Sequence, residues 1–174
     1  MAVGVGLTAQ AAEDASLAVT PISGSGPYTY QVTLTDTGTT DIGSVWYAWV
    51  PGEFFLPGDP SSAAGPTGWT ANIVNEGPNL SSIQFQSTAP GFDIAPGTSM
   101  TFSFVAPFSP AQLAAAPNSG LSVAYAGAVD ASAPSGNFTV QPAPEPSELS
   151  LLLAGSIVAC LVGFQRIKSC RFKF

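Results

Sequence analysis

TYQVTLTD, residues Thr29–Asp36, alternates apolar and polar side chains along its whole length. The apolar set is Tyr30, Val32 and Leu34, and the polar set is Gln31, Thr33 and Thr35. A period of two residues is typical of a β-strand with one face buried and one face toward solvent. The stretch therefore predicts a half-buried strand.

Seven further segments have a similar strand character and are separated by Gly, Pro, Asn and Asp. They are Ser16–Thr20, Ser44–Val50, Gly68–Val74, Ser81–Ser87, Ser99–Pro107, Gly120–Val129 and Gly136–Val140. About eight short strands with this turn chemistry predict an all-β protein. We expect a single small antiparallel β-sandwich, Ig-like or jelly-roll-like, over residues 12–141.

Three local features refine this prediction. Trp46 and Trp49 lie too close in sequence for one regular strand face, so we expect a bulge or burial on both faces. The stretch 50–68 is rich in Gly and Pro and predicts a long loop, in which Phe54, Phe55 and Leu56 fold back over an edge of the sandwich. Ser109–Pro117 predicts a short helix with a capping box.

The charges of the 174-residue chain are segregated. All eleven acids precede a C-terminal apolar run and all four bases follow it, for a formal net charge of −7. A body without Lys or Arg lacks the contacts that phosphate backbones need, which argues against a nucleic-acid partner.

The sequence has no histidine, and its two cysteines, Cys160 and Cys170, lie in or after the apolar run. The body therefore has no disulfide framework, no Cys/His zinc set and no His- or Cys-based catalyst. Its serines lack an ordinary activating base. We predict no catalytic residue, no metal site and no cofactor other than, as a candidate, calcium.

The candidate calcium ligands are Asp36, Asp41 and Asp59, and the candidate carboxylate pairs are Asp36 with Asp41 and Glu53 with Asp59. We favour solvated turn acids, because Asp at a turn is explained by its backbone hydrogen bonds. Four aromatics could form a flat platform for sugar rings or could be core: Trp46, Tyr47, Trp49 and Trp69.

The C-terminal apolar run predicts a membrane-spanning helix over residues 149–165, about 25 Å long. By the positive-inside rule, the bases that follow place residues 166–174 in the cytoplasm and the body outside. The alternative is a buried C-terminal helix of a soluble fold. The predicted anchor side chains are Leu149, Leu151, Leu152, Leu153, Ile157, Val158, Leu161, Val162 and Phe164. The topology-determining bases are Arg166, Lys168, Arg171 and Lys173.

Pro144-Glu145-Pro146, the apolar helix and the basic terminus together resemble the PEP-CTERM sorting signal of exopolysaccharide-producing Gram-negative bacteria. The resemblance covers residues 142–174 and implies that an exosortase recognises the tripeptide and processes the chain near it. Most of Tyr28–Val140 also resembles an extracellular module of PEP-CTERM proteins. The implied location is transient anchoring in the inner membrane, then the cell surface or extracellular space.

The N-terminal residues 1–11 resemble the end of a secretory signal peptide, with Ala9 and Ala11 as the small residues of a cleavage site. The alternative is a disordered tail. We expect a truncated signal peptide whose true start lies upstream, with cleavage after Ala11.

Two functions follow as hypotheses from different classes. The first is a non-catalytic surface or matrix protein processed by an exosortase. The second is a carbohydrate-binding module that grips exopolysaccharide through exposed Trp and Tyr side chains. Exposure of the aromatic side chains favours the second hypothesis, and their burial favours the first.

Overall fold

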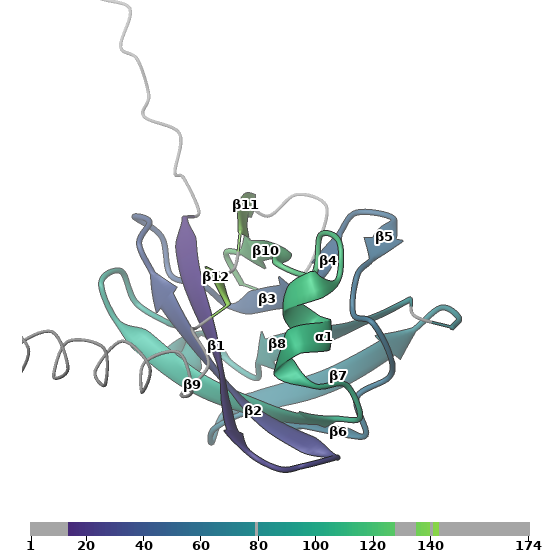
Figure 1. Ribbon diagram of the computed structural model, residues 1–174. Helices are drawn as coiled ribbons and strands as arrows, with labels where there is room; N and C mark the ends of the chain where they lie inside the picture. Colours follow the sequence, from purple (N-terminus) through teal and green to yellow (C-terminus); the bar gives the residue numbers. More distant parts are fainter. Residues whose placement is uncertain (1–13, 79, 128–134, 140, 143–174) are drawn as a thin grey trace, which may run out of the picture. The chain divides into compact units, whose positions relative to one another are not determined.

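The structure, a computed structural model, describes residues 14–78, 80–127, 135–139 and 141–142. About half of these residues lie in two five-stranded sheets (Figure 1). The first sheet has the order β12-β1-β2-β9-β6: Gln141–Pro142, Ala15–Ser23, Tyr28–Asp36, Ser99–Ala106 and Ser62–Ala64. The second has the order β11-β10-β3-β8-β7: Ser135–Thr139, Leu121–Tyr125, Ser44–Tyr47, Ser81–Ser87 and Trp69–Asn75. Strands β4 (Trp49–Val50) and β5 (Glu53–Phe54) form a separate two-stranded sheet.

Strand β2 lies at the centre of the first sheet and pairs antiparallel with β1 and β9. Its apolar side chains Tyr30, Val32 and Leu34 are buried, and the polar side chains between them are partly exposed. The prediction of a half-buried strand at Thr29–Asp36 is thus confirmed. All pairings inside the two sheets are antiparallel except β1 with β12, among the residues that the structure describes.

Aromatic side chains join the two sheets into a β-sandwich. The ring centroids of Phe85 and Phe102 lie 4.5 Å apart, and those of Tyr47 and Phe104 lie 5.7 Å apart. Each pair takes one ring from each sheet, so the apolar faces of both sheets share one core. The rings of Tyr30 and Phe104 stack with centroids 4.7 Å apart. The Tyr30 hydroxyl donates a hydrogen bond to the Phe108 carbonyl oxygen, with 2.6 Å between the two oxygens.

Every one of the eight predicted strand segments contains a strand, and the all-β, antiparallel expectation is confirmed. The expected helix is α1 (Pro110–Ala115), and its capping box is present between Ser109 and Gln112. Leu56 is fully buried and Phe55 packs against the core, as expected of a segment that folds back over the sandwich.

The prediction that 50–68 is one long loop without strands was wrong, although this stretch is rich in Gly and Pro. Two short strands lie there, β5 and β6. Strand β6 pairs with β9 through Ser62 opposite Val105 and Ala64 opposite Ser103. Its three residues have little side-chain pattern of their own, so the backbone hydrogen bonds offered by β9 decide its conformation.

Replacing Phe104 with alanine tests the core. Phe104 is 1% exposed and contacts both Tyr30 and Tyr47, so its loss should lower the free energy of unfolding by about 3–5 kcal/mol. Chemical denaturation of the full-length chain measures this. The control is Thr101→Ala, an exposed position on the same strand, which should cost no more than about 1 kcal/mol. Equal losses in the two variants would contradict the assignment of Phe104 to the shared core.

Candidate functional site

A backbone kink between β3 and β4 brings two tryptophans together. Ala48 has a φ of 55°, which ends the regular strand between Tyr47 and Trp49. The rings of Trp46 and Trp49 then stack, with centroids 4.5 Å apart, and both side chains remain partly exposed. The kink provides the irregularity that the spacing of the two tryptophans predicts.

The second sheet presents polar side chains beside this stack. On β8, Ile83 and Phe85 point into the core, so Gln84 and Gln86 must point to the opposite face. Gln84 lies directly across from Trp46 on β3, and Asn72 of β7 lies across from Gln84. Residues that are paired in this way share one face of a sheet.

Trp46, Trp49, Gln84 and Gln86 together form a partly exposed surface that we call the tryptophan–glutamine strip. Our sequence-based prediction did not include the two glutamines. The alternation in SSIQFQS, Ser81–Ser87, was the available signal, because it already separates Gln84 and Gln86 from their apolar neighbours.

Trp46 also carries an unpaired polar atom. Its indole nitrogen is buried and finds no hydrogen-bond partner among the described residues. An unsatisfied buried donor costs free energy, so phenylalanine would fill the same place at lower cost if apolar packing were the only requirement.

The other two aromatics of the predicted platform lie in the core. Tyr47 is 1% exposed, and burial raises the pKa of its hydroxyl. Trp69 is 7% exposed, stands edge-on to Phe102 and donates its indole N–H to the Phe92 carbonyl oxygen at 2.7 Å. Tyr47 and Trp69 therefore support the sandwich, and only Trp46 and Trp49 face a surface.

A hollow of about 280 Å³ adjoins one end of the strip. Gln86 contributes to both, and the partly buried carboxylate of Asp93 belongs to the hollow. Gly43 and Gly127 approach closely there, since a Cβ added to Gly43 would lie 2.3 Å from the Gly127 Cα. The remaining lining residues are Ser87, Thr88, Ala89 and Pro90.

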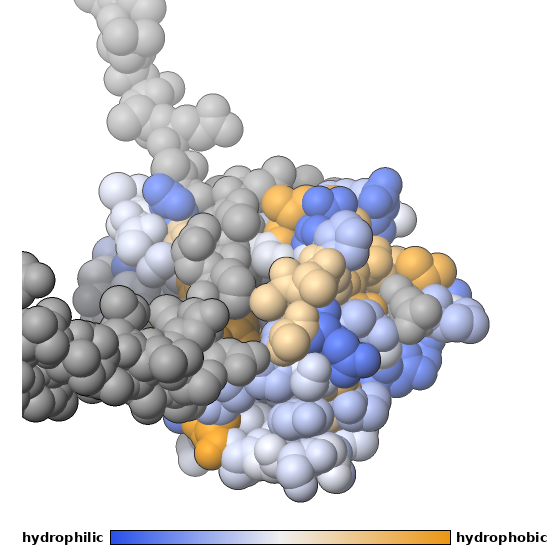
Figure 2. Space-filling model, viewed as in Figure 1, coloured by the Kyte–Doolittle hydropathy of each residue, from blue (hydrophilic) through white to orange (hydrophobic). Residues whose placement is uncertain are grey.

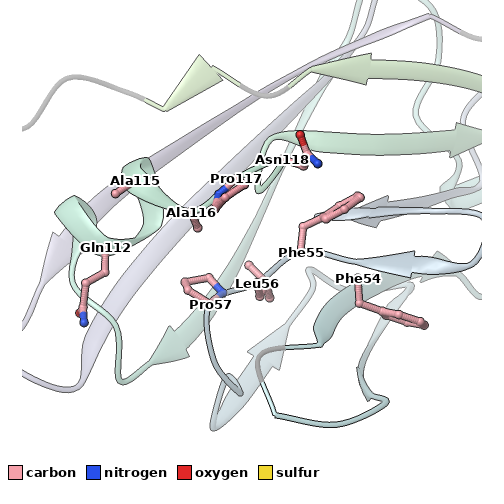
Figure 3. A pocket seen from close by; sticks show the side chains of 9 residues that line it. All are labelled: Phe54, Phe55, Leu56, Pro57, Gln112, Ala115, Ala116, Pro117 and Asn118. Atoms are coloured by element: carbon pink, nitrogen blue, oxygen red, sulfur yellow. The ribbon is translucent and has the colours of Figure 1, made fainter.

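A second concave surface, an apolar groove of about 510 Å³, lies between the segment after β4 and the C-terminal side of α1. Figure 3 shows Leu56 and Pro57 facing Ala116 and Pro117, while the ring of Phe54 points away from α1. Figure 2 shows apolar residues gathered over α1 on the same side of the molecule. None of the described residues that line the groove has an ionisable side chain, so these residues offer contact area without acid–base chemistry.

The three candidate calcium ligands have different surroundings. Asp36 is fully buried, Asp41 is exposed in the same turn, and Asp59 accepts a hydrogen bond from the Ser81 hydroxyl. Glu53 is exposed in β5. Within the described parts of the chain, no group of three or more Asp, Glu, His or Cys side chains is placed to hold a metal ion.

Asp36 joins the end of β2 to the start of β9. Its Oδ1 accepts the Gly38 N–H at 2.8 Å, its own N–H donates to Thr98 O at 3.0 Å, and its carbonyl accepts the Gly97 N–H at 2.9 Å. Oδ2 is buried and has no hydrogen-bond partner among the described residues. Burial raises the pKa of the Asp36 carboxyl, with smaller contributions from the charges of Asp41 and Asp14, against the Gly38 hydrogen bond.

The predicted targeting segments lie outside the described residues. They are the signal cleavage residues Ala9 and Ala11, the tripeptide Pro144-Glu145-Pro146, the apolar run 149–165 and the basic residues of 166–174. In the part of the chain that is described, no helix has the length and apolar character to span a membrane.

Comparison with known proteins gives distant likenesses in structure alone. No protein-family model matches the chain, and no protein of curated function matches it either. An inactive mutant of a GH20 exo-β-N-acetylglucosaminidase from Vibrio harveyi superposes with a TM-score of 0.42 at 12% identity, over 75% of this chain and 18% of that chain.

A cohesin module from a family 33 glycoside hydrolase of Clostridium perfringens ATCC13124 gives a TM-score of 0.35 at 12% identity. This match covers 77% of the chain and all of the module. At such low identities and TM-scores, neither likeness carries an argument about function.

Asp36→Asn tests the electrostatics of the β2 turn. A carboxyl whose pKa is raised on folding binds its proton more tightly in the folded state, so the free energy of unfolding falls as pH rises above the ordinary value of 3.8. Asparagine does not titrate. The stability of the variant minus that of the wild type should therefore increase with pH across this window.

Chemical denaturation of both proteins at a series of pH values measures this difference. The control is Glu76→Gln, which also removes one negative charge but at an exposed position. A difference for Asp36→Asn that stays constant or decreases with rising pH would contradict the raised pKa.

Proposed function

We propose that this protein is an exported, non-catalytic component of the cell surface or extracellular matrix, sorted and processed by an exosortase through its C-terminal signal. The observation that carries the proposal is the order Pro144-Glu145-Pro146, uncharged apolar run, basic terminus. The apolar run 149–165 anchors the chain in the membrane, and the basic residues of 166–174 stay on the cytoplasmic side. Processing near the tripeptide then frees the body.

The chemistry of the body supports a non-catalytic role. Residues 14–127 contain no His, Cys, Lys or Arg, so their serines lack an ordinary activating base. The acids Glu53 and Asp59 are exposed, and Asp59 pairs with a serine hydroxyl. The body is therefore suited to act through its surfaces, as a folded scaffold that binds other molecules without transforming them.

A second candidate function is carbohydrate binding, and the stacked pair of Trp46 and Trp49 favours it. Each indole ring covers one face of the other, and the apolar surface that the stack leaves exposed suits the C–H face of a sugar ring. Gln84 and Gln86 lie on the same face of the sheet and can donate and accept hydrogen bonds. The two functions are compatible, since a matrix protein can bind the polymer around it.

Replacing Pro144, Glu145 and Pro146 with alanines tests the sorting function. The apolar run and the basic terminus are unchanged, so export and membrane insertion should continue while processing stops. The full-length protein should accumulate in the membrane fraction of its native host, and the extracellular fraction should lose it. Immunoblots of the two fractions measure this outcome.

The matched control replaces the exposed turn residues Thr37 and Thr39 with alanines and should be released like the wild type. Release of the Pro144-Glu145-Pro146 variant at the wild-type level would overturn the role of the tripeptide.

A further inference from the structure

The charge of the body restricts what the tryptophan–glutamine strip can bind. Every ionisable side chain of residues 14–127 that carries charge at neutral pH is an acid. Asp93 lies in the hollow at the end of the strip. A polymer with carboxylate, sulfate or phosphate groups would be repelled there and would find no Lys or Arg to pair with.

The side chains of the strip match the two kinds of surface of an uncharged sugar. The indole rings of Trp46 and Trp49 match its apolar face, which consists of C–H groups. The amides of Gln84 and Gln86 both donate and accept, as sugar hydroxyls do, and the Asp93 carboxylate accepts from hydroxyl donors. An anionic group only accepts, so it would use half of this hydrogen-bonding capacity.

The arrangement is elongated. Trp46 precedes Trp49 along the chain, Gln84 and Gln86 lie on the neighbouring strand β8, and Gly43 begins the hollow. From Gly43 to the end of β3 at Tyr47, the strand extends on the order of 13 Å. Thr70 and Asn72 of the edge strand β7 flank this line and are exposed. An extended chain of several sugar rings fits such a surface better than a single sugar does.

We infer that the tryptophan–glutamine strip and the Asp93 hollow form one binding site for an uncharged polysaccharide chain. The chain packs on the exposed part of the Trp46–Trp49 stack, is hydrogen-bonded by Gln84 and Gln86, and reaches the hollow beside Asp93. This inference rests on the carbohydrate-binding function proposed above and adds the ligand class and the residues. The sorting function does not depend on it.

Affinity gel electrophoresis of the full-length chain in mild detergent tests the ligand class. The gels contain an uncharged polymer, namely hydroxyethyl cellulose, xyloglucan or galactomannan, or an anionic one, namely alginate or polygalacturonate. Uncharged polymers should retard the protein, and the retardation should not change with salt, because no ion pair is involved. The anionic polymers should not retard it.

Variants of the strip test the residues. Trp46→Ala should weaken binding by about 30-fold, as expected for a tryptophan at the centre of a contact. Gln86→Ala and Asp93→Ala should each weaken it by about 3- to 10-fold, the effect of one lost hydrogen bond. The control is Gln31→Ala, on the outer face of the first sheet, which should bind like the wild type. Trp46→Phe keeps an aromatic ring and should retain most of the binding even if Trp46→Ala does not fold.

The outcomes separate the two levels of the proposal. If no polymer of either class retards the wild type, carbohydrate binding itself is wrong. If only anionic polymers do so, the uncharged ligand class is wrong. If uncharged polymers bind but Gln86→Ala and Asp93→Ala both bind as tightly as Gln31→Ala, the assigned site is wrong, whether or not Trp46→Ala folds.

Discussion

The packing of Phe102 against Phe85 and of Phe104 against Tyr47 holds the two sheets together, and the arrangement of every outer face depends on it. No cysteine occurs in the body, so burial of these apolar faces must provide most of the stability. Because side chains alternate along a strand, fixing Phe85 and Ile83 inward fixes Gln84 outward. The candidate site is therefore a direct consequence of the core.

The alternation of side chains along a strand also explains the positive φ of Ala48. In a regular strand, Trp46 and Trp49 would point to opposite faces of the sheet, and one of the two side chains would have to fit into the core. The kink at Ala48 lets Tyr47 remain buried while both tryptophans share the outer surface and stack. A positive φ at a non-glycine residue is a strained conformation, and Ala48 is held in it by hydrogen bonds from its own N–H to Ser122 Oγ and from the Phe55 N–H to its carbonyl oxygen.

The strand positions and the capping box of α1 could be predicted, because period-two alternation and the Ser-to-Gln spacing are local signals. The three-residue strand β6 and the parallel pairing of β12 with β1 could not, because long-range backbone pairing decides them. The sequence pattern alone could not show which of the four predicted platform aromatics are buried. Tyr47 and Trp69 are buried in the core, and Trp46 and Trp49 are partly exposed. The hollow could not be predicted either, because it forms where Gly43 and Gly127, which are 84 positions apart in sequence, approach each other.

We have proposed that the sandwich is the mature product of export and processing, freed from a C-terminal tail that carries all of the positive charge. The intact mass of the protein in the extracellular fraction of its native host tests this claim most directly. We expect the mass of a chain that begins near Ala12 and ends near Pro146. A full-length mass found only in membranes would contradict it and would make residues 149–165 a permanent anchor.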